Sequence, residues 1–227
     1  LTLYREAKRR IRWLTHEEAQ RLIDALPEYM ADMAVFSLAT GLRQSNVLGL
    51  KWTQINLERK TAWIEADEAK AGRPIGVALN QTALGILEKQ MGRNPSFVFT
   101  QPNGKPVKSI SSRIWKNALS KAGIADFRWH DLRHTWASWL IQAGVPLAAL
   151  QEMGGWENVG MVQKYAHLAP EHLHGHAALL DSVGLGCDTK QAHPNIGGGK
   201  EKSLNDCLGL GKVVGRERFE RSTNGLK

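Results

Sequence analysis

Apolar residues recur with a helical period through the N-terminal part of the chain. Three helices are expected there, over 15–26, 30–40 and 44–50. Thr15 and Glu18 form the T-x-x-E capping box that opens the first helix, and Pro27 ends it. The second helix is almost entirely apolar, so we expect it to be buried and to end at Gly41.

The pattern then changes to alternation of apolar and polar positions, which indicates strands. Three short antiparallel strands are expected over 54–57, 61–65 and 75–79. A longer loop, 69–74, joins the second strand to the third. Asn80 is placed to cap a helix over 81–91, and Phe97–Phe99 is expected to be a brief extended piece within a loop.

From Ser109 onward the pattern is helical again. Helices are expected over 109–122, 131–143, 146–153, 159–166 and 170–180. The helix over 131–143 places its apolar residues on one side and His130, Arg133 and His134 on the other, and His130 stands where it could cap that helix. The predicted fold class is therefore α+β, mainly α-helical, with a small three-stranded antiparallel sheet.

The chain has 227 residues, of which 42% are hydrophobic and 23% charged, as in an ordinary globular protein. The sequence contains no apolar run long enough for a membrane span and no signal-peptide pattern. Its two cysteines cannot build a disulfide framework. These features exclude a membrane protein and a secreted disulfide scaffold, so we expect a cytoplasmic protein.

Three segments are expected along the chain. They are a basic linker remnant over 1–14, one folded domain over 15–181 and a Gly-rich, disordered C-terminal tail over 182–227. Because the sequence begins with Leu1 and not with Met, we expect it to be a fragment of a longer protein.

The net charge of +8 is unevenly distributed. Residues 89–125 contain seven basic side chains and no acidic one, and Arg113 and Lys116 lie opposite the apolar stripe of the helix over 109–122. A polyanion such as DNA would use this region, although a solvated basic face explains the charge equally well. The candidate DNA-binding residues are Lys105, Lys108, Arg113, Lys116 and Lys121.

Four places in the sequence carry candidate chemistry. They are Arg43 at a helix start, Lys70 in the hairpin loop, the His130–His134 run, and Tyr165. Each alone has a plainer explanation: an internal ion pair for Arg43, a solvated side chain for Lys70, a surface cluster for the run, and a core position for Tyr165. Together, two arginines, a histidine, a lysine and a tyrosine fit phosphoryl transfer through a tyrosine nucleophile.

Four motifs resemble those of the tyrosine recombinases, specifically the catalytic domain of phage-type integrases. They are Thr40–Arg43 with Leu48–Trp52 for the first-arginine motif, Lys70 for the hairpin lysine, His130–His134 for the H-x-x-R box, and Met153–Trp156 with Tyr165–His167 for the closing box. Trp156 stands where many members have histidine, and Asn46 where an acidic residue is common. The domain over 15–181 then corresponds to the catalytic domain, and the linker would lead to the separate N-terminal DNA-gripping domain that members usually carry.

The resemblance implies a site-specific recombinase (an integrase) that works without cofactor, metal or ATP. By this resemblance Tyr165 attacks the scissile phosphate and becomes joined to the DNA 3′ end, while Arg43 and Arg133 clamp the non-bridging oxygens. Lys70 protonates the departing 5′ oxygen, His130 takes or shares the tyrosine proton, and Trp156 positions the group. The implied partners are double-stranded DNA, a homotetramer on the synaptic DNA and an accessory DNA-bending protein, in a bacterial or prophage-encoded setting.

Two other functions stay open from the sequence. One is strand cleavage like that of a type IB topoisomerase, which uses similar residues on a phosphate. The other is a DNA-binding module without catalysis. A metal enzyme is disfavoured, because the sequence has no carboxylate cluster of the two-metal kind and only His172, His174 and His176 suggest a metal site.

Overall fold

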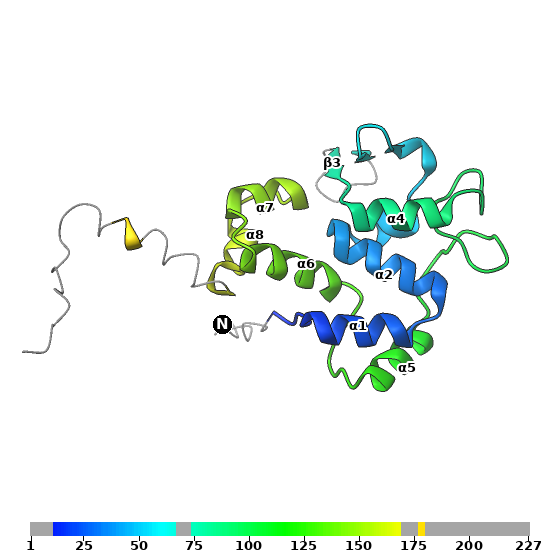
Figure 1. The fold of residues 1–227 in the computed structure, drawn as a ribbon, viewed down its shortest axis with the longest axis horizontal. Helices are drawn as coiled ribbons and strands as arrows, with labels where there is room; N and C mark the ends of the chain where they lie inside the picture. Colours follow the sequence, from blue (N-terminus) through cyan, green and yellow to red (C-terminus); the bar gives the residue numbers. More distant parts are fainter. Residues whose placement is uncertain (1–10, 67–73, 169–176, 180–227) are drawn as a thin grey trace, which may run out of the picture. The chain divides into compact units, whose positions relative to one another are not determined.

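The computed structural model describes residues 11–66, 74–168 and 177–179 (Figure 1). The chain divides into two units, Leu1–His172 and Leu173–Lys227, and all the elements below lie in the first. Lys70 lies outside the described residues, as do the basic segment 1–10, most of the helix expected over 170–180, and all of the Gly-rich tail over 182–227.

The described part of the first unit is mainly helical with one small sheet, which confirms the predicted fold class. The helices are α1 (His16–Ala25), α2 (Glu28–Thr40), α3 (Gln44–Leu48), α4 (Gln81–Gln90), α5 (Ser112–Ala122), α6 (Asp131–Gln142), α7 (Leu147–Gly154) and α8 (Gly160–Gln163), with the short 3₁₀ segments η1 (Trp52–Gln54) and η2 (Ala166–Leu168). The strands are β1 (Ile55–Asn56), β2 (Thr61–Ile64) and β3 (Ile75–Ala78). They pair antiparallel in the order β1-β2-β3.

Local sequence signals explain most helix boundaries. The capping box is formed as expected: the backbone N–H of Glu18 donates to Thr15 Oγ1 at 3.1 Å, and the N–H of Thr15 donates to Glu18 Oε2 at 2.9 Å. The helix expected from Ser109 begins at Ser112 instead, because the Ser111 hydroxyl caps it by accepting from the N–H of Ile114. The helix expected over 159–166 is divided, since α8 ends at Gln163.

Helix α2 lies in the core and packs against both α4 and α6 (Figure 1). As its apolar sequence predicts, most of it is buried, and Met30, Met33 and Phe36 have no exposed surface. Its one buried carboxylate, Asp32, accepts hydrogen bonds from Lys89 Nζ at 2.9 Å and from Gln90 Nε2 at 2.7 Å. These bonds compensate for burying the charge and join α2 to α4.

Helix α6 is buried around most of its circumference, including part of the side that carries His130, Arg133 and His134. Arg133 on that side is only 5% exposed, and Ser138 is fully buried. The helix tolerates this because its polar side chains find backbone partners; Ser138 Oγ, for example, donates to the carbonyl of His134. His130 occupies the N-cap position of α6 as expected, but its side chain makes no capping bond there.

Gly41 ends α2 and lies against the ring of Trp136 on α6. Its φ of 66° is left-handed, and a Cβ there would come within 2.3 Å of the Trp136 ring. We predict that Gly41→Ala lowers the free energy of unfolding by about 1–3 kcal/mol more than Gly123→Ala. Gly123 is the matched control, because its φ of 69° carries the same strain but its added Cβ would meet no atom within 4 Å. Equal losses in denaturant titrations would contradict a packing role for Gly41.

Candidate active site

Arg133 lies at the centre of the candidate site and joins the ends of two helices. Its Nη1 donates to the carbonyl of Gly41 at 2.7 Å, and its Nη2 donates to the carbonyl of Gly154 at 2.5 Å. Gly41 follows α2, and Gly154 is the last residue of α7. The planar guanidinium carries five N–H donors in a fixed fork, so it can hold both carbonyls and still offer donors to a ligand.

The indole of Trp156 covers the guanidinium of Arg133. Arg133 Cζ lies 4.2 Å from the centroid of the indole, which is within range of a cation–π interaction. Trp136 stacks behind Trp156 with the ring centroids 6.0 Å apart. Only glycine fits at position 154, because a Cβ there would lie 2.0 Å from the Trp156 ring. The two glycines at the helix ends therefore let the tryptophans pack tightly around Arg133.

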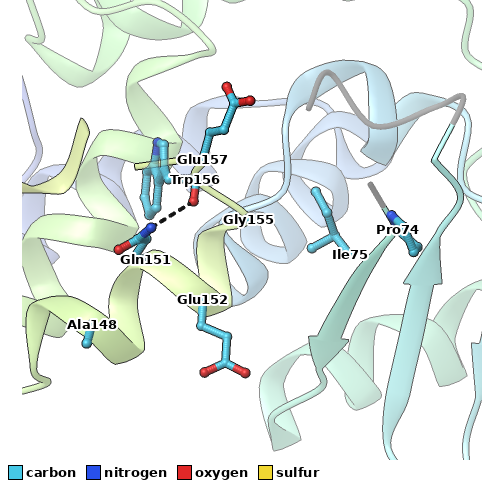
Figure 2. A pocket seen from close by; sticks show the side chains of 8 residues that line it. All are labelled: Pro74, Ile75, Ala148, Gln151, Glu152, Gly155, Trp156 and Glu157. Carbon is cyan, nitrogen blue, oxygen red and sulfur yellow. Dashed lines mark hydrogen bonds between the residues drawn. The ribbon is translucent and has the colours of Figure 1, made fainter. Parts of the chain in front are cut away.

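The loop that carries Trp156 is held by α7 on one side and by the small sheet on the other. Gln151 Nε2 donates to the backbone carbonyl of Trp156 at 3.2 Å, and Figure 2 shows this bond beside a hollow of about 260 Å³. On the opposite wall of the hollow is Ile75, at the start of β3, and a Cβ at Gly155 would meet its side chain. The small sheet thus supports the loop from which Trp156 reaches Arg133.

Tyr165 is paired with His134, which the sequence analysis had not assigned. Tyr165 follows α8, is 0% exposed, and its hydroxyl lies 2.5 Å from His134 Nδ1. Burial raises the pKa of Tyr165, and burial together with the nearby Lys164 lowers the pKa of His134 to about 3. At neutral pH the pair is therefore a neutral imidazole and a protonated phenol. That arrangement suits a general base and its nucleophile.

A cavity of about 240 Å³ adjoins this pair and is lined mainly by basic side chains. Its lining consists of Arg43, His130, Arg133, His134, Gly155, Trp156, Glu157, Met161, Lys164 and Tyr165. Arg43 Nη1 is buried and has no hydrogen-bond partner among the residues that the structure describes. Burial lowers the pKa of Arg43, and burial together with Arg43 lowers that of Arg133 to about 10, so both stay charged at neutral pH. Among the described residues Glu157 is the only carboxylate that lines this cavity, so the two arginines favour an anionic ligand.

Five of the six predicted catalytic residues meet at this cavity. They are Arg43, His130, Arg133, Trp156 and Tyr165. The sixth, Lys70, lies outside the described residues, four positions before Pro74. Among the described carboxylates none pairs with Arg43, which argues against the internal ion pair considered from the sequence. The ring of His130 stands edge-on to that of His134, with the centroids 5.1 Å apart.

The predicted DNA-binding residues lie apart from the cavity. Lys105, Lys108, Arg113, Lys116 and Lys121 are all exposed, and none lines it. The other two basic residues of the stretch are different, because Lys89 and Arg93 pair with acidic residues of α2. Lys89 Nζ lies 3.0 Å from Glu28 and 2.9 Å from Asp32, and Arg93 lies 3.6 Å from Glu28. The free positive charge is thus concentrated on α5 and the loop before it.

Comparison with known proteins decides the family. Residues 12–172 match the model of the phage integrase family. The chain belongs to this family. An integrase of Salmonella phage P22 is 50% identical over 187 residues, covering 77% of this chain and 48% of that protein. Tyrosine recombinase XerA of Pyrococcus furiosus is 28% identical over 170 residues, covering 70% of this chain and 58% of that protein. The chain thus spans about half the length of these relatives.

Solved structures of integrases share the fold. The catalytic domain of bacteriophage HP1 integrase has a TM-score of 0.59 at 22% identity, covering 75% of this chain and 95% of that one. The Tn1549 transposon integrase in complex with a circular intermediate DNA has a TM-score of 0.63 at 20% identity, covering 78% of this chain and 68% of that one. The similarity to the tyrosine recombinases inferred from the four motifs is therefore confirmed for the family and for the fold.

None of the helices formed by the described residues is long and apolar enough to cross a bilayer. The described residues also contain no group of three or more His, Cys, Asp or Glu side chains that could bind a metal ion. His172, His174 and His176 lie outside the described residues.

The half-buried His134 should make folding sensitive to acid. Its pKa is about 3 in the fold against an ordinary 6.5, so the unfolded chain binds a proton between these values and the folded chain does not. Its contribution to stability is therefore complete above pH 6.5 and is lost as the pH falls toward 3. We predict that the thermal midpoint drops less between pH 7 and about pH 4.5 in His134→Gln than in the wild type. Parallel profiles for the two proteins would contradict this.

Proposed function

We propose that this chain is the catalytic part of a site-specific recombinase, an integrase, that cleaves and rejoins DNA through a covalent 3′-phosphotyrosine intermediate. One observation carries the proposal: the Tyr165–His134 pair opens on a cavity that holds Arg43 and Arg133. A nucleophile with its base, beside two cations suited to phosphate oxygens, is the equipment for phosphoryl transfer. Membership of the phage integrase family supports the same reaction.

In the proposed reaction the Tyr165 oxygen attacks the scissile phosphorus, and its proton passes to His134 Nδ1. Arg43 and Arg133 stabilise the charge on the non-bridging oxygens, and we assign His130 to the phosphate as well. The bond from phosphorus to the 5′ oxygen breaks, and Lys70 supplies the proton that this oxygen takes. A phosphodiester is exchanged for a phosphotyrosine linkage, so the step needs neither ATP nor a metal ion.

The nucleophile must become accessible before it can react. Tyr165 has no exposed surface, whereas a phosphate of duplex DNA has to come within bonding distance of its hydroxyl. Tyr165 lies between two short segments, α8 and η2. We infer that DNA binding shifts this short segment and brings the hydroxyl out of its contact with His134 toward the phosphate.

Double-stranded DNA is the proposed partner. The structural neighbours include the XerH recombinase bound to its difH substrate. By analogy we propose that this chain works on a synaptic DNA complex as a homotetramer, with an accessory protein that bends the DNA, in the cytoplasm of a bacterium. The segments 1–14, 15–181 and 182–227 are then a linker, the catalytic domain and a tail.

Covalent capture tests the proposal. The chain is incubated in EDTA with a library of randomised duplexes, each nicked so that a short 5′-OH fragment is lost after cleavage. We expect protein to be trapped on the 3′ phosphate of a selected sequence. A strict need for magnesium, or binding without any covalent product, would contradict the proposed mechanism. Relaxation of supercoiled DNA without sequence preference would favour the topoisomerase alternative instead.

The exposed basic face of α5 should contact DNA phosphates. We predict that changing Arg113 and Lys116 together to Ala weakens DNA binding and lowers the log–log salt slope by about one per lost contact. The control changes Lys89 and Arg93 to Ala, because Glu28 and Asp32 already neutralise these two charges. Binding isotherms over a range of salt concentrations measure both slopes. Identical slopes in the two double variants would mean that α5 does not meet DNA.

A further inference from the structure

Lys164 is a basic residue of the cavity that the proposed reaction does not use. It directly precedes Tyr165 and ends α8. Its side chain lines the same cavity as Arg43 and Arg133, and its Nζ lies 5.1 Å from the centroid of the Tyr165 ring. The ammonium is therefore close to the nucleophile and to both arginines.

None of the described acidic residues neutralises the charge of Lys164. Within the described part of the chain its side chain makes no ion pair and no hydrogen bond, although it is exposed and could reach one. Partial desolvation, and after it the charge of Arg133, lower the pKa of Lys164. Lys89 shows the opposite behaviour, since hydrogen bonds to Asp32 and Glu28 raise its pKa. Lys164 is thus held among cations, where a bound anion would stabilise it.

Lys164 is adjacent to Tyr165 in the chain, so it should move together with the nucleophile. Tyr165 has to leave its buried position to reach a phosphate, and residues joined by one peptide bond move together. A shift of the segment after α8 would therefore carry the Lys164 ammonium toward the phosphate along with the Tyr165 hydroxyl. The arginines, in contrast, are fixed on α3 and α6.

We propose that Lys164 is a further catalytic residue, whose ammonium binds a non-bridging oxygen of the scissile phosphate during attack by Tyr165. This inference rests on the proposed recombinase function. Lys164 keeps its proton throughout, while the bond from the Tyr165 oxygen to phosphorus forms and the bond from phosphorus to the 5′ oxygen breaks. The ammonium stabilises the negative charge that passes from the attacking oxygen to the phosphate.

Three variants test the role of the charge in single-turnover cleavage of the captured DNA. Lys164→Met keeps the aliphatic stem without the charge and should slow covalent attachment on the order of a hundredfold, the scale for losing one transition-state donor. Lys164→Arg keeps the charge and should retain most of the rate. Gln163→Ala changes the neighbouring exposed residue, which lines no part of the cavity, and should cleave like the wild type. A wild-type rate in Lys164→Met would overturn the inference.

A modified substrate separates phosphate binding from proton donation. When sulfur replaces the bridging 5′ oxygen, the leaving group needs no proton, so a missing general acid is rescued but a missing phosphate contact is not. We expect Lys164→Met to stay slow on this substrate, and full rescue would overturn the inference. If Lys164→Met does not fold, Lys164→Gln takes its place. If the wild type itself forms no covalent product, the recombinase proposal fails, which is a different result from a wild-type rate in the variant.

Discussion

Replacing Tyr165 with phenylalanine is expected to abolish covalent attachment to DNA while leaving DNA affinity within a few fold. The change removes only the hydroxyl, which is the proposed nucleophile, and the phenyl ring still fills the same fully buried site. The hydroxyl's contact with His134 is lost, but a small loss of stability does not explain a complete loss of cleavage. Denaturing gels measure the covalent product, and gel-shift titrations measure the affinity.

The matched control for this change is Tyr29→Phe. Tyr29 packs at the edge of the core, away from the cavity, so its variant should form covalent product at the wild-type rate. Covalent product from the Tyr165→Phe protein would show that another residue attacks the phosphate.

Replacing either Arg43 or Arg133 with alanine should slow cleavage by at least about a hundredfold. The two variants should differ in their stability. Arg133→Ala should also lower stability, because the carbonyls of Gly41 and Gly154 lose their buried donor and Trp156 loses the cation it covers. A hydrogen bond to a charged group is worth about 1.5–3 kcal/mol. Arg43→Ala should leave the thermal midpoint nearly unchanged or slightly raised, since the Nη1 atom of Arg43 is buried and finds no partner within the described part of the chain.

Arg133→Lys is the informative control for this pair of variants. It keeps a positive charge, but an ammonium cannot present the planar fork that spans the two carbonyls. We therefore expect Arg133→Lys to be destabilised as well, by less than Arg133→Ala. Thermal unfolding and single-turnover cleavage give the two readouts. A large loss of stability in Arg43→Ala would mean that Arg43 serves the fold and not an anion.

Local signals in the sequence predicted most of the secondary structure, and the family motifs indicated most of the described residues of the site. The capping box at Thr15 and the apolar run that ends at Gly41 each act over a few residues, and both are present in the fold. The antiparallel hairpins follow from the alternation that buries Ala62, Ile64 and Val77 on one face. Five residues far apart in the sequence meet at the cavity as the family motifs implied.

Contacts between distant parts of the chain were not predictable in the same way. The burial of Arg133 depends on two glycine carbonyls that come from the ends of other helices, and nothing near position 133 indicates them. Tertiary contacts also decide that His134 and not His130 is the partner of Tyr165. In the sequence His134 directly follows Arg133, and His130 lies three residues before it. Their four-residue spacing places them on one helix face, so a second histidine near the first could have been considered.

Ion pairs between residues far apart in the sequence were not predictable either. The stretch 89–125 contains no acidic residue, yet Lys89 is neutralised by Glu28 and Asp32, which belong to α2. Counting charges along the sequence therefore overestimated the basic surface available to DNA. Which lysines remain free depends on how α2 and α4 pack together.

The most direct test of the account is to identify the atom that is joined to DNA. The covalent complex is trapped on nicked DNA in EDTA, digested with nuclease and protease, and analysed by tandem mass spectrometry. The account predicts a single modified peptide, with the phosphate of a DNA 3′ end on the oxygen of Tyr165, and a free 5′-hydroxyl on the released strand. A 5′-linked adduct, or a phosphate on any other residue, would contradict it.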